Sequence, residues 1–148
     1  MRKNRGFTLI EIMITLAILS ILLTIAIPTY KDYVRKGNRV AAQGELMQIA
    51  TNLERYKALQ LTYSNATLAA GTNSIYGSTT YPKGATGTKI QYNLTMPTIT
   101  ATTWVLVATP ANVQDGDGVI KLNSLGQNCW KKAASDCDLA DATQAWGN

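Results

Sequence analysis

Residues 7–27 form an apolar run of 21 residues that carries a single charge, Glu11. As an α-helix, such a run would be about 30 Å long, which matches the hydrocarbon core of a bilayer. A carboxylate costs on the order of 3 kcal/mol near the middle of a membrane and less near the end of a span. Glu11 lies near one end of the run. The run therefore predicts a membrane helix, and the presence of an acidic residue in it has to be explained.

Three interpretations fit this segment, which follows three basic residues and Gly6. A secretory signal peptide has an apolar stretch of about 7–15 residues and a small-residue cleavage site, and residues 25–30 make a poor one. A plain membrane anchor fits the length but leaves Glu11 unexplained. Cleavage between Gly6 and Phe7 would instead retain the apolar run and make Glu11 the fifth residue of the mature chain.

The bulk composition excludes several function classes. A chain of 148 residues has room for one domain and a membrane segment. Without residues 1–6 its net charge falls from +5 to +2, because 11 Lys and Arg then face 9 Asp and Glu, so the basic balance says little about nucleic acid. The chain has no histidine, and its sequence shows no nucleophile motif or phosphate loop. We therefore expect a protein that is not an enzyme and uses no cofactor or metal.

The two cysteines, Cys129 and Cys137, lie close together near the C-terminus. In a small domain this arrangement favours a disulfide and an oxidising compartment. Two free buried thiols in a cytosolic protein are the alternative, and a preceding membrane span disfavours it.

Helical periodicity continues beyond the membrane-length run. Pro28 removes one backbone donor and should kink or loosen the helix there. An apolar stripe then follows at helical spacing, with polar side chains on the opposite side. The pattern predicts one helix from about residue 7 to about residue 59, apolar all round in its first half and amphipathic in its second. The members of the stripe are Leu46, Ile49, Ala50, Leu53 and Tyr56.

The segment after the helix, residues 61–89, is rich in Gly, Thr and Ser and predicts a long surface loop. Packing of Tyr76 and Tyr81 would anchor this loop.

Alternating apolar residues then predict three strands, over residues 90–96, 104–108 and 119–123. Pro97 and Pro110 bracket the second strand, as proline is confined to strand ends and edges. The short links between the strands favour an antiparallel meander. The expected fold is α+β: a long N-terminal helix whose apolar stripe packs on a small antiparallel sheet.

The residues GFTLIE at positions 6–11 and AIPTY at positions 26–30 resemble the N-terminus of type IV pilins, with the short leader of the type IVa class. The resemblance implies that a prepilin peptidase cuts after Gly6 and that the new N-terminal amine of Phe7 is methylated. It also implies that Glu11 pairs with the N-terminal amine of a neighbouring subunit during filament assembly. Such a cation makes a carboxylate in an apolar bundle tolerable.

The rest of the chain is most similar to minor pilins of type IVa systems. The likeness is carried by residues 54–56, 92–95, 108–110 and 120–126. Relatives usually place their first cysteine just before the last of these strands, whereas both cysteines of this chain follow it. A bridge between them would therefore close only a short loop.

The resemblance implies a structural subunit of a type IV pilus, a single-pass protein of the bacterial inner membrane before assembly and part of the cell-surface pilus afterwards. Its partners would be other pilin subunits, the prepilin peptidase and the inner-membrane assembly machinery. Its filament would support pilus assembly, twitching motility, adhesion or DNA uptake. A major pilin and a type II secretion pseudopilin are the alternatives, although pseudopilins generally lack the C-terminal disulfide.

We expect a leader at 1–6, a hydrophobic assembly helix at 7–28, the amphipathic helix half at 29–60, an αβ-loop at 61–89, the sheet at 90–127 and a disulfide region at 128–148.

Two further motifs permit weaker interpretations. The DGDG motif at residues 115–118 could begin a calcium loop, but no glutamate follows at the distance that an EF-hand needs, so a plain turn is favoured. The WKK motif at residues 130–132 could stack on and attract single-stranded DNA. Two lysines make a weak patch, so DNA is a possible partner that we rank below a purely structural role.

Overall fold

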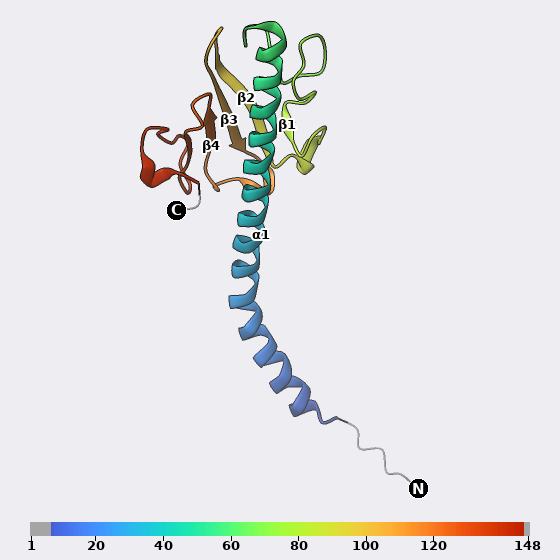
Figure 1. Ribbon diagram of the computed structural model, residues 1–148. Coiled ribbons are helices and arrows are strands. Elements are labelled where there is room, and N and C mark those ends of the chain that lie inside the picture. The colour runs from blue at the N-terminus through green and yellow to red at the C-terminus, as the bar shows by residue number, and fades with distance from the viewer. Residues whose placement is uncertain (1–6, 147–148) are drawn as a thin grey trace. The chain divides into compact units, whose positions relative to one another are not determined.

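The computed structural model describes residues 7–146, so Gly6 and the expected leader lie outside the described residues. The chain forms two compact units, Met1–Lys36 and Gly37–Asn148. Helix α1 (Leu9–Gln60) begins in the first unit and ends in the second (Figure 1). The prediction of a single helix from about residue 7 to about residue 59 is confirmed.

The first unit contains the apolar part of α1, and none of its described residues is buried. Its hydroxyl side chains donate hydrogen bonds to carbonyls three or four residues earlier, as Thr24 does to Ser20 at 2.9 Å and Thr29 to Ile25 at 3.0 Å. These bonds let polar side chains lie in an apolar span. The helix assignment continues through Pro28, so a weak point there stays a prediction.

The second unit contains one antiparallel sheet in the order β1-β2-β3-β4-β5, which confirms the predicted meander. Two short edge strands were not predicted, because two or three residues are too few to show alternation. β2 continues past Pro97, which the sequence placed outside the strands, because the register with β3 shifts between Thr95 and Thr98. The strands are β1 (Thr80–Tyr81), β2 (Tyr92–Ile99), β3 (Trp104–Pro110), β4 (Ile120–Asn123) and β5 (Asn128–Trp130).

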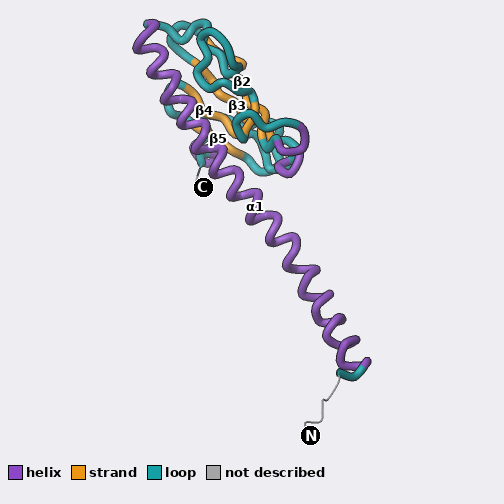
Figure 2. Tube along the Cα trace, turned by 90° about the vertical axis from the view of Figure 1, so that its right-hand side faces the viewer, coloured by secondary structure: helices purple, strands orange, loops and turns teal. Residues whose placement is uncertain are grey.

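The core of the second unit lies between α1 and the inner face of the sheet (Figure 2). Three members of the predicted helix stripe are fully buried there, and the remaining two, Ala50 and Tyr56, pack against them. The sheet contributes every second residue, as the alternation of a half-buried strand requires. The buried side chains of this interface are Ala42, Leu46, Ile49, Leu53, Tyr92, Leu94, Trp104, Leu106, Ala108, Ile120 and Leu122.

The 61–89 segment also contributes to the core, although the sequence suggested a surface loop. Tyr63, Leu68 and Tyr76 are buried, which confirms that Tyr76 anchors the segment, and Tyr81 is half-buried in β1. Many other residues of the segment are exposed, and the segment ends in a short 3-10 helix, Gly87–Lys89. The remaining short helices are η2 (Asn112–Gln114) and η3 (Ala142–Gln144).

Candidate functional site

The N-terminal end of α1 holds the predicted assembly residues. Thr8 precedes the first helical residue, and its hydroxyl accepts a hydrogen bond from the backbone N–H of Glu11 at 3.3 Å. Thr8 and Glu11 therefore have the spacing of a capping box, in which a Glu or Gln three residues after the cap also supports the helix start. Thr8 thus caps the start of α1 through the backbone of Glu11, a role that was not predicted although the Thr-x-x-Glu pattern is visible in the sequence.

Phe7 and Glu11 border the same shallow hollow of about 250 Å³, together with Ile12 and Thr15. Phe7 is 79% exposed. The carboxylate of Glu11 is exposed beside apolar side chains. A cation that enters this hollow would therefore meet an anion that has few other polar groups around it.

The rest of the 7–27 segment presents apolar side chains on all sides. Within residues 7–146, α1 is the helix that is long and apolar enough to cross a membrane, and its apolar window has no buried residue. An apolar surface of this size is consistent with membrane anchoring or with packing against other helices. The large exposed side chains are Phe7, Leu9, Ile10, Ile12, Met13, Ile14, Leu16, Ile18, Leu19, Ile21, Leu22, Leu23, Ile25 and Ile27.

The predicted disulfide between Cys129 and Cys137 is present, with a Cα–Cα distance of 5.9 Å. Cys129 lies in β5 opposite Lys121 of β4, whereas its neighbour Trp130 lies opposite the buried Ile120. Because successive side chains of a strand point to opposite faces, the disulfide lies on the outer face of the sheet and Trp130 on the face that packs against α1.

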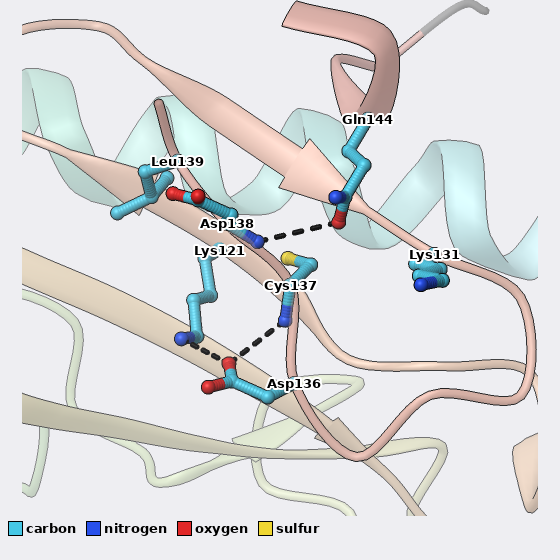
Figure 3. Close-up of a pocket in the computed structure, with 7 residues that line it drawn as sticks. All are labelled: Lys121, Lys131, Asp136, Cys137, Asp138, Leu139 and Gln144. Atoms are coloured by element: carbon cyan, nitrogen blue, oxygen red, sulfur yellow. Dashed lines mark hydrogen bonds and ion pairs between the residues drawn. The ribbon is translucent and has the colours of Figure 1, made fainter. Parts of the chain in front are cut away.

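A hollow of about 520 Å³ borders the disulfide on this outer face (Figure 3). Lys121 forms an ion pair with Asp136, and the same carboxylate accepts the backbone N–H of Cys137 at 2.8 Å. Both bonds lower the pKa of Asp136, and the bond from Lys121 has the larger effect. The polar groups of the hollow largely bind one another, so it favours no particular ligand. Its lining residues are Lys121, Lys131, Asp136, Cys137, Asp138, Leu139 and Gln144.

Trp130 is not the free stacking platform that the WKK motif suggested. The guanidinium of Arg39 on α1 lies 3.7 Å from the centroid of its ring. The indole N–H donates to the backbone carbonyl of Asp117 at 3.0 Å. One face and the polar edge of the ring are therefore already used within the fold.

Arg39 belongs to a partly buried polar network, here called the Arg39 cluster, that joins α1 to β2 and to the turn before β4. Asn38 donates to Gln114 at 3.1 Å, Gln114 to the hydroxyl of Tyr92 at 2.9 Å, and Tyr92 to one carboxylate oxygen of Asp117 at 2.7 Å. Arg39 binds the other oxygen at 2.5 Å. Burial raises the pKa of Tyr92 above its usual 10, and the hydrogen bond from Gln114 partly offsets this rise.

The Arg39 cluster was not predicted from the sequence. Arg39 and Asp117 expose only 13% and 5% of their side chains. A signal existed for Arg39, which lies three residues before the buried Ala42 and so on the buried face of α1. Residues 115–118 lie in the predicted turn, and the carboxylate of Asp117 accepts hydrogen bonds from Arg39 and Tyr92. Within residues 7–146, no group of three His, Cys, Asp or Glu residues could hold a metal ion.

The loop after β5 carries Lys131 and Lys132, both exposed. Ala133 follows with φ +57°, a left-handed conformation that costs a residue with a Cβ about 1–2 kcal/mol. The loop keeps this conformation because Ala133 donates to the carbonyl of Asp117 at 3.4 Å and the carbonyl of Ala134 accepts from Val119 at 3.1 Å. In the described part of the second unit, residues 37–146, Lys131 and Lys132 are the only neighbouring pair of exposed basic residues.

Comparison with known proteins agrees with this architecture. The chain is similar to the type IV major alpha-pilin of Moraxella bovis, with 50% identity over 46 residues, which covers 31% of this chain and 29% of that protein. It is similar to the type IV major fimbrial protein FimA of Dichelobacter nodosus, with 34% identity over 100 residues, 62% of this chain and 64% of that protein. The alignments with several of these pilins span about a third of their length.

The fold is similar to the crystal structure of the non-core minor pilin PilV of Neisseria meningitidis. The TM-score is 0.51 and the identity 18%, over 71% of this chain and 94% of that one. Residues 1–27 match the model of the prokaryotic N-terminal methylation motif. Residues 28–129 match the model described as type IV minor pilin ComP, DNA uptake sequence receptor. With most of its length in these two matches, the chain belongs to the type IV pilins, in the ComP minor-pilin family.

Proposed function

We propose that this protein is a minor subunit of a type IV pilus, anchored in the inner membrane by α1 and moved into the filament through the same helix. The observation that carries the proposal is the exposed apolar surface of residues 7–27 with one carboxylate near its end, in a chain of a minor-pilin family. The family match does not favour the alternative of a major pilin. The disulfide disfavours a pseudopilin.

Processing and pairing at the N-terminus are part of this proposal. A prepilin peptidase would cut between Gly6 and Phe7, and the new amine of Phe7 would be methylated, in line with the match to the methylation motif. Glu11 would then pair with the amine of a neighbouring subunit. The hollow that Phe7 and Glu11 share supports this role, because it leaves the carboxylate open to a partner.

The experiment is mass spectrometry of the protein in sheared pili and in membranes. We expect the chain in both fractions, without residues 1–6 and with one methyl group on Phe7. A chain that retains residues 1–6 in pili would contradict the processing site, and its absence from pili would contradict the function.

DNA binding is a second proposed activity, favoured by the description of the matching family as a DNA uptake sequence receptor. The best candidate contact is the pair Lys131 and Lys132, because both are exposed and their loop is held between the disulfide and the turn at Asp117. Contacts of this kind would be to phosphates, since Trp130 is packed against Arg39. The loop begins just beyond the end of the family match at residue 129.

A binding assay with the full-length protein in neutral detergent tests this activity. The Lys131→Gln/Lys132→Gln variant should lose affinity for duplex DNA at low salt, with the slope of log affinity against log salt reduced by about two. Unchanged affinity and slope would exclude this loop as the contact.

A further inference from the structure

The lysine loop, residues 131–134, is fastened to the turn before β4 by backbone contacts. The carbonyl of Asp117 accepts both the indole N–H of Trp130 at 3.0 Å and the backbone N–H of Ala133 at 3.4 Å. A Cβ on Gly118 would lie 2.1 Å from the carbonyl oxygen of Lys131, so the two backbones touch. The position of Lys131 and Lys132 therefore depends on where Asp117 and Trp130 lie.

One side chain of α1 contacts both of these supports. Arg39 binds the carboxylate of Asp117 at 2.5 Å, and its guanidinium covers the ring of Trp130 at 3.7 Å. Planar guanidinium groups suit both contacts at once, because they pair with carboxylates and stack on aromatic rings. Tyr92 holds the second carboxylate oxygen, which fixes the rotation of the Asp117 side chain.

We infer that Arg39 is a positioning residue for DNA binding: through Asp117 and Trp130 it holds the lysine loop in the conformation in which Lys131 and Lys132 reach neighbouring phosphates. The inference rests on the proposed DNA contact at this loop. Arg39 itself is 13% exposed, and its guanidinium is engaged by a carboxylate and a ring, so it acts through the loop and not by touching DNA.

The test is a double-mutant cycle on DNA affinity with the full-length protein in neutral detergent and duplex DNA at low salt. Arg39→Met should lower affinity about threefold or more in the wild-type chain and have almost no effect in the Lys131→Gln/Lys132→Gln background, because residues that act as one unit are not additive. Arg39→Lys keeps the charge but loses the planar stack, and it should restore only part of the affinity.

Arg55→Met is the matched control, since it removes the same charge from an exposed position of the same helix. It should change affinity little and equally in both backgrounds. Deuterium uptake gives a local readout: in Arg39→Met it should rise more in peptides that cover residues 115–134 than in those that cover residues 92–99. If Arg39→Met unfolds the whole sheet, Trp130→Phe decides in its place, because it keeps an aromatic ring beside Arg39 and removes the indole N–H that donates to Asp117.

The outcomes separate the two proposals. If the double lysine variant keeps full affinity, the DNA contact at this loop is wrong and the inference falls with it. If the lysine variant loses affinity but Arg39→Met and Trp130→Phe do not, the DNA contact stands and the positioning role is wrong. Equal losses from Arg39→Met in both backgrounds would show a direct or purely electrostatic effect, which also overturns the inference.

Discussion

The guanidinium of Arg39 lies 3.7 Å from the ring centroid of Trp130, across 91 positions of the sequence, while it also binds Asp117. Helix α1, the turn before β4 and the disulfide-closed segment thus meet at one cation that is only 13% exposed. The Arg39 guanidinium is tolerated here only while Asp117 and Trp130 contact it, because removing an unpaired charge from water costs free energy.

Removal of Arg39 should therefore destabilise the second unit strongly. Arg39→Met leaves the Asp117 carboxylate buried without its cation and should lower the free energy of unfolding by about 3 kcal/mol. Urea unfolding of the protein in neutral detergent measures this. The Arg39→Met/Asp117→Asn variant should be less destabilised than the sum of its two single variants, since the unpaired charge is gone. Strict additivity would contradict the ion pair's role.

Gly118 and Gly116 form a matched pair within one turn. Both have positive φ, +107° and +79°, but a Cβ on Gly118 would lie 2.1 Å from the Lys131 carbonyl oxygen, while one on Gly116 would meet nothing within 4 Å. Gly116→Ala should cost about 1 kcal/mol of stability from backbone strain alone. Gly118→Ala should cost clearly more, because the lysine loop must also move. Similar unfolding midpoints for the two variants would show that the close contact is not required.

The disulfide should stabilise the second unit modestly. A bridge between residues eight positions apart restricts only a short loop of the unfolded chain, which is worth roughly 2.5 kcal/mol in the chain-entropy model. Cys129→Ser/Cys137→Ser and the reduced wild-type protein should both show this loss in urea unfolding. A reductant should leave the unfolding midpoint of the double variant unchanged. A shift of that midpoint would mean that the reductant acts elsewhere.

Alkaline pH should weaken the fold. Burial raises the pKa of Tyr63, Tyr76, Tyr81 and Tyr92 above the usual 10, so the folded state holds these phenol protons more tightly than the unfolded state. Their contribution to stability is fully present below about pH 10 and is lost as the pH rises toward the folded pKa values.

Urea midpoints measured between about pH 9 and about pH 11.5 should fall with rising pH, together with a rise in phenolate absorbance on unfolding. Tyr81→Phe removes one half-buried phenol and should make the fall less steep. A midpoint that stays constant across this range would contradict the burial of these hydroxyls.

The sequence predicted the parts of the fold that repeat along the chain. The stripe around Leu46 and the alternation around Leu106 each recur over several residues, and both led to the buried faces that the structure contains. Edge strands β1 and β5 are too short to repeat. Arg39 and Asp117 lie 78 positions apart, and local patterns carry no information on such a pairing.

The candidate sites were predictable to different degrees. Glu11 could be identified because a lone carboxylate in an apolar run is conspicuous, and the Cys129–Cys137 pair because its members are close in sequence. The orientation of Trp130 could not be predicted, since it depends on the register of β5 with β4. The sequence therefore offered Trp130 as a surface for DNA, whereas the fold packs it against Arg39.

The most direct test of the central proposal is the amount of the protein in sheared pili when Glu11 is changed to Gln. Glutamine retains the size of Glu11 and the Thr-x-x-Gln spacing of a capping box, and its backbone N–H can still bond to Thr8, but it cannot neutralise a cation. We predict that Glu11→Gln stays in the membrane at wild-type levels and is depleted in sheared pili about tenfold, as the loss of roughly 1.4 kcal/mol of pairing energy would produce. Glu11→Asp, which keeps the charge, should be depleted less. Wild-type amounts of Glu11→Gln in the pili would contradict the pairing of Glu11 with the Phe7 amine, because assembly would then not need the carboxylate.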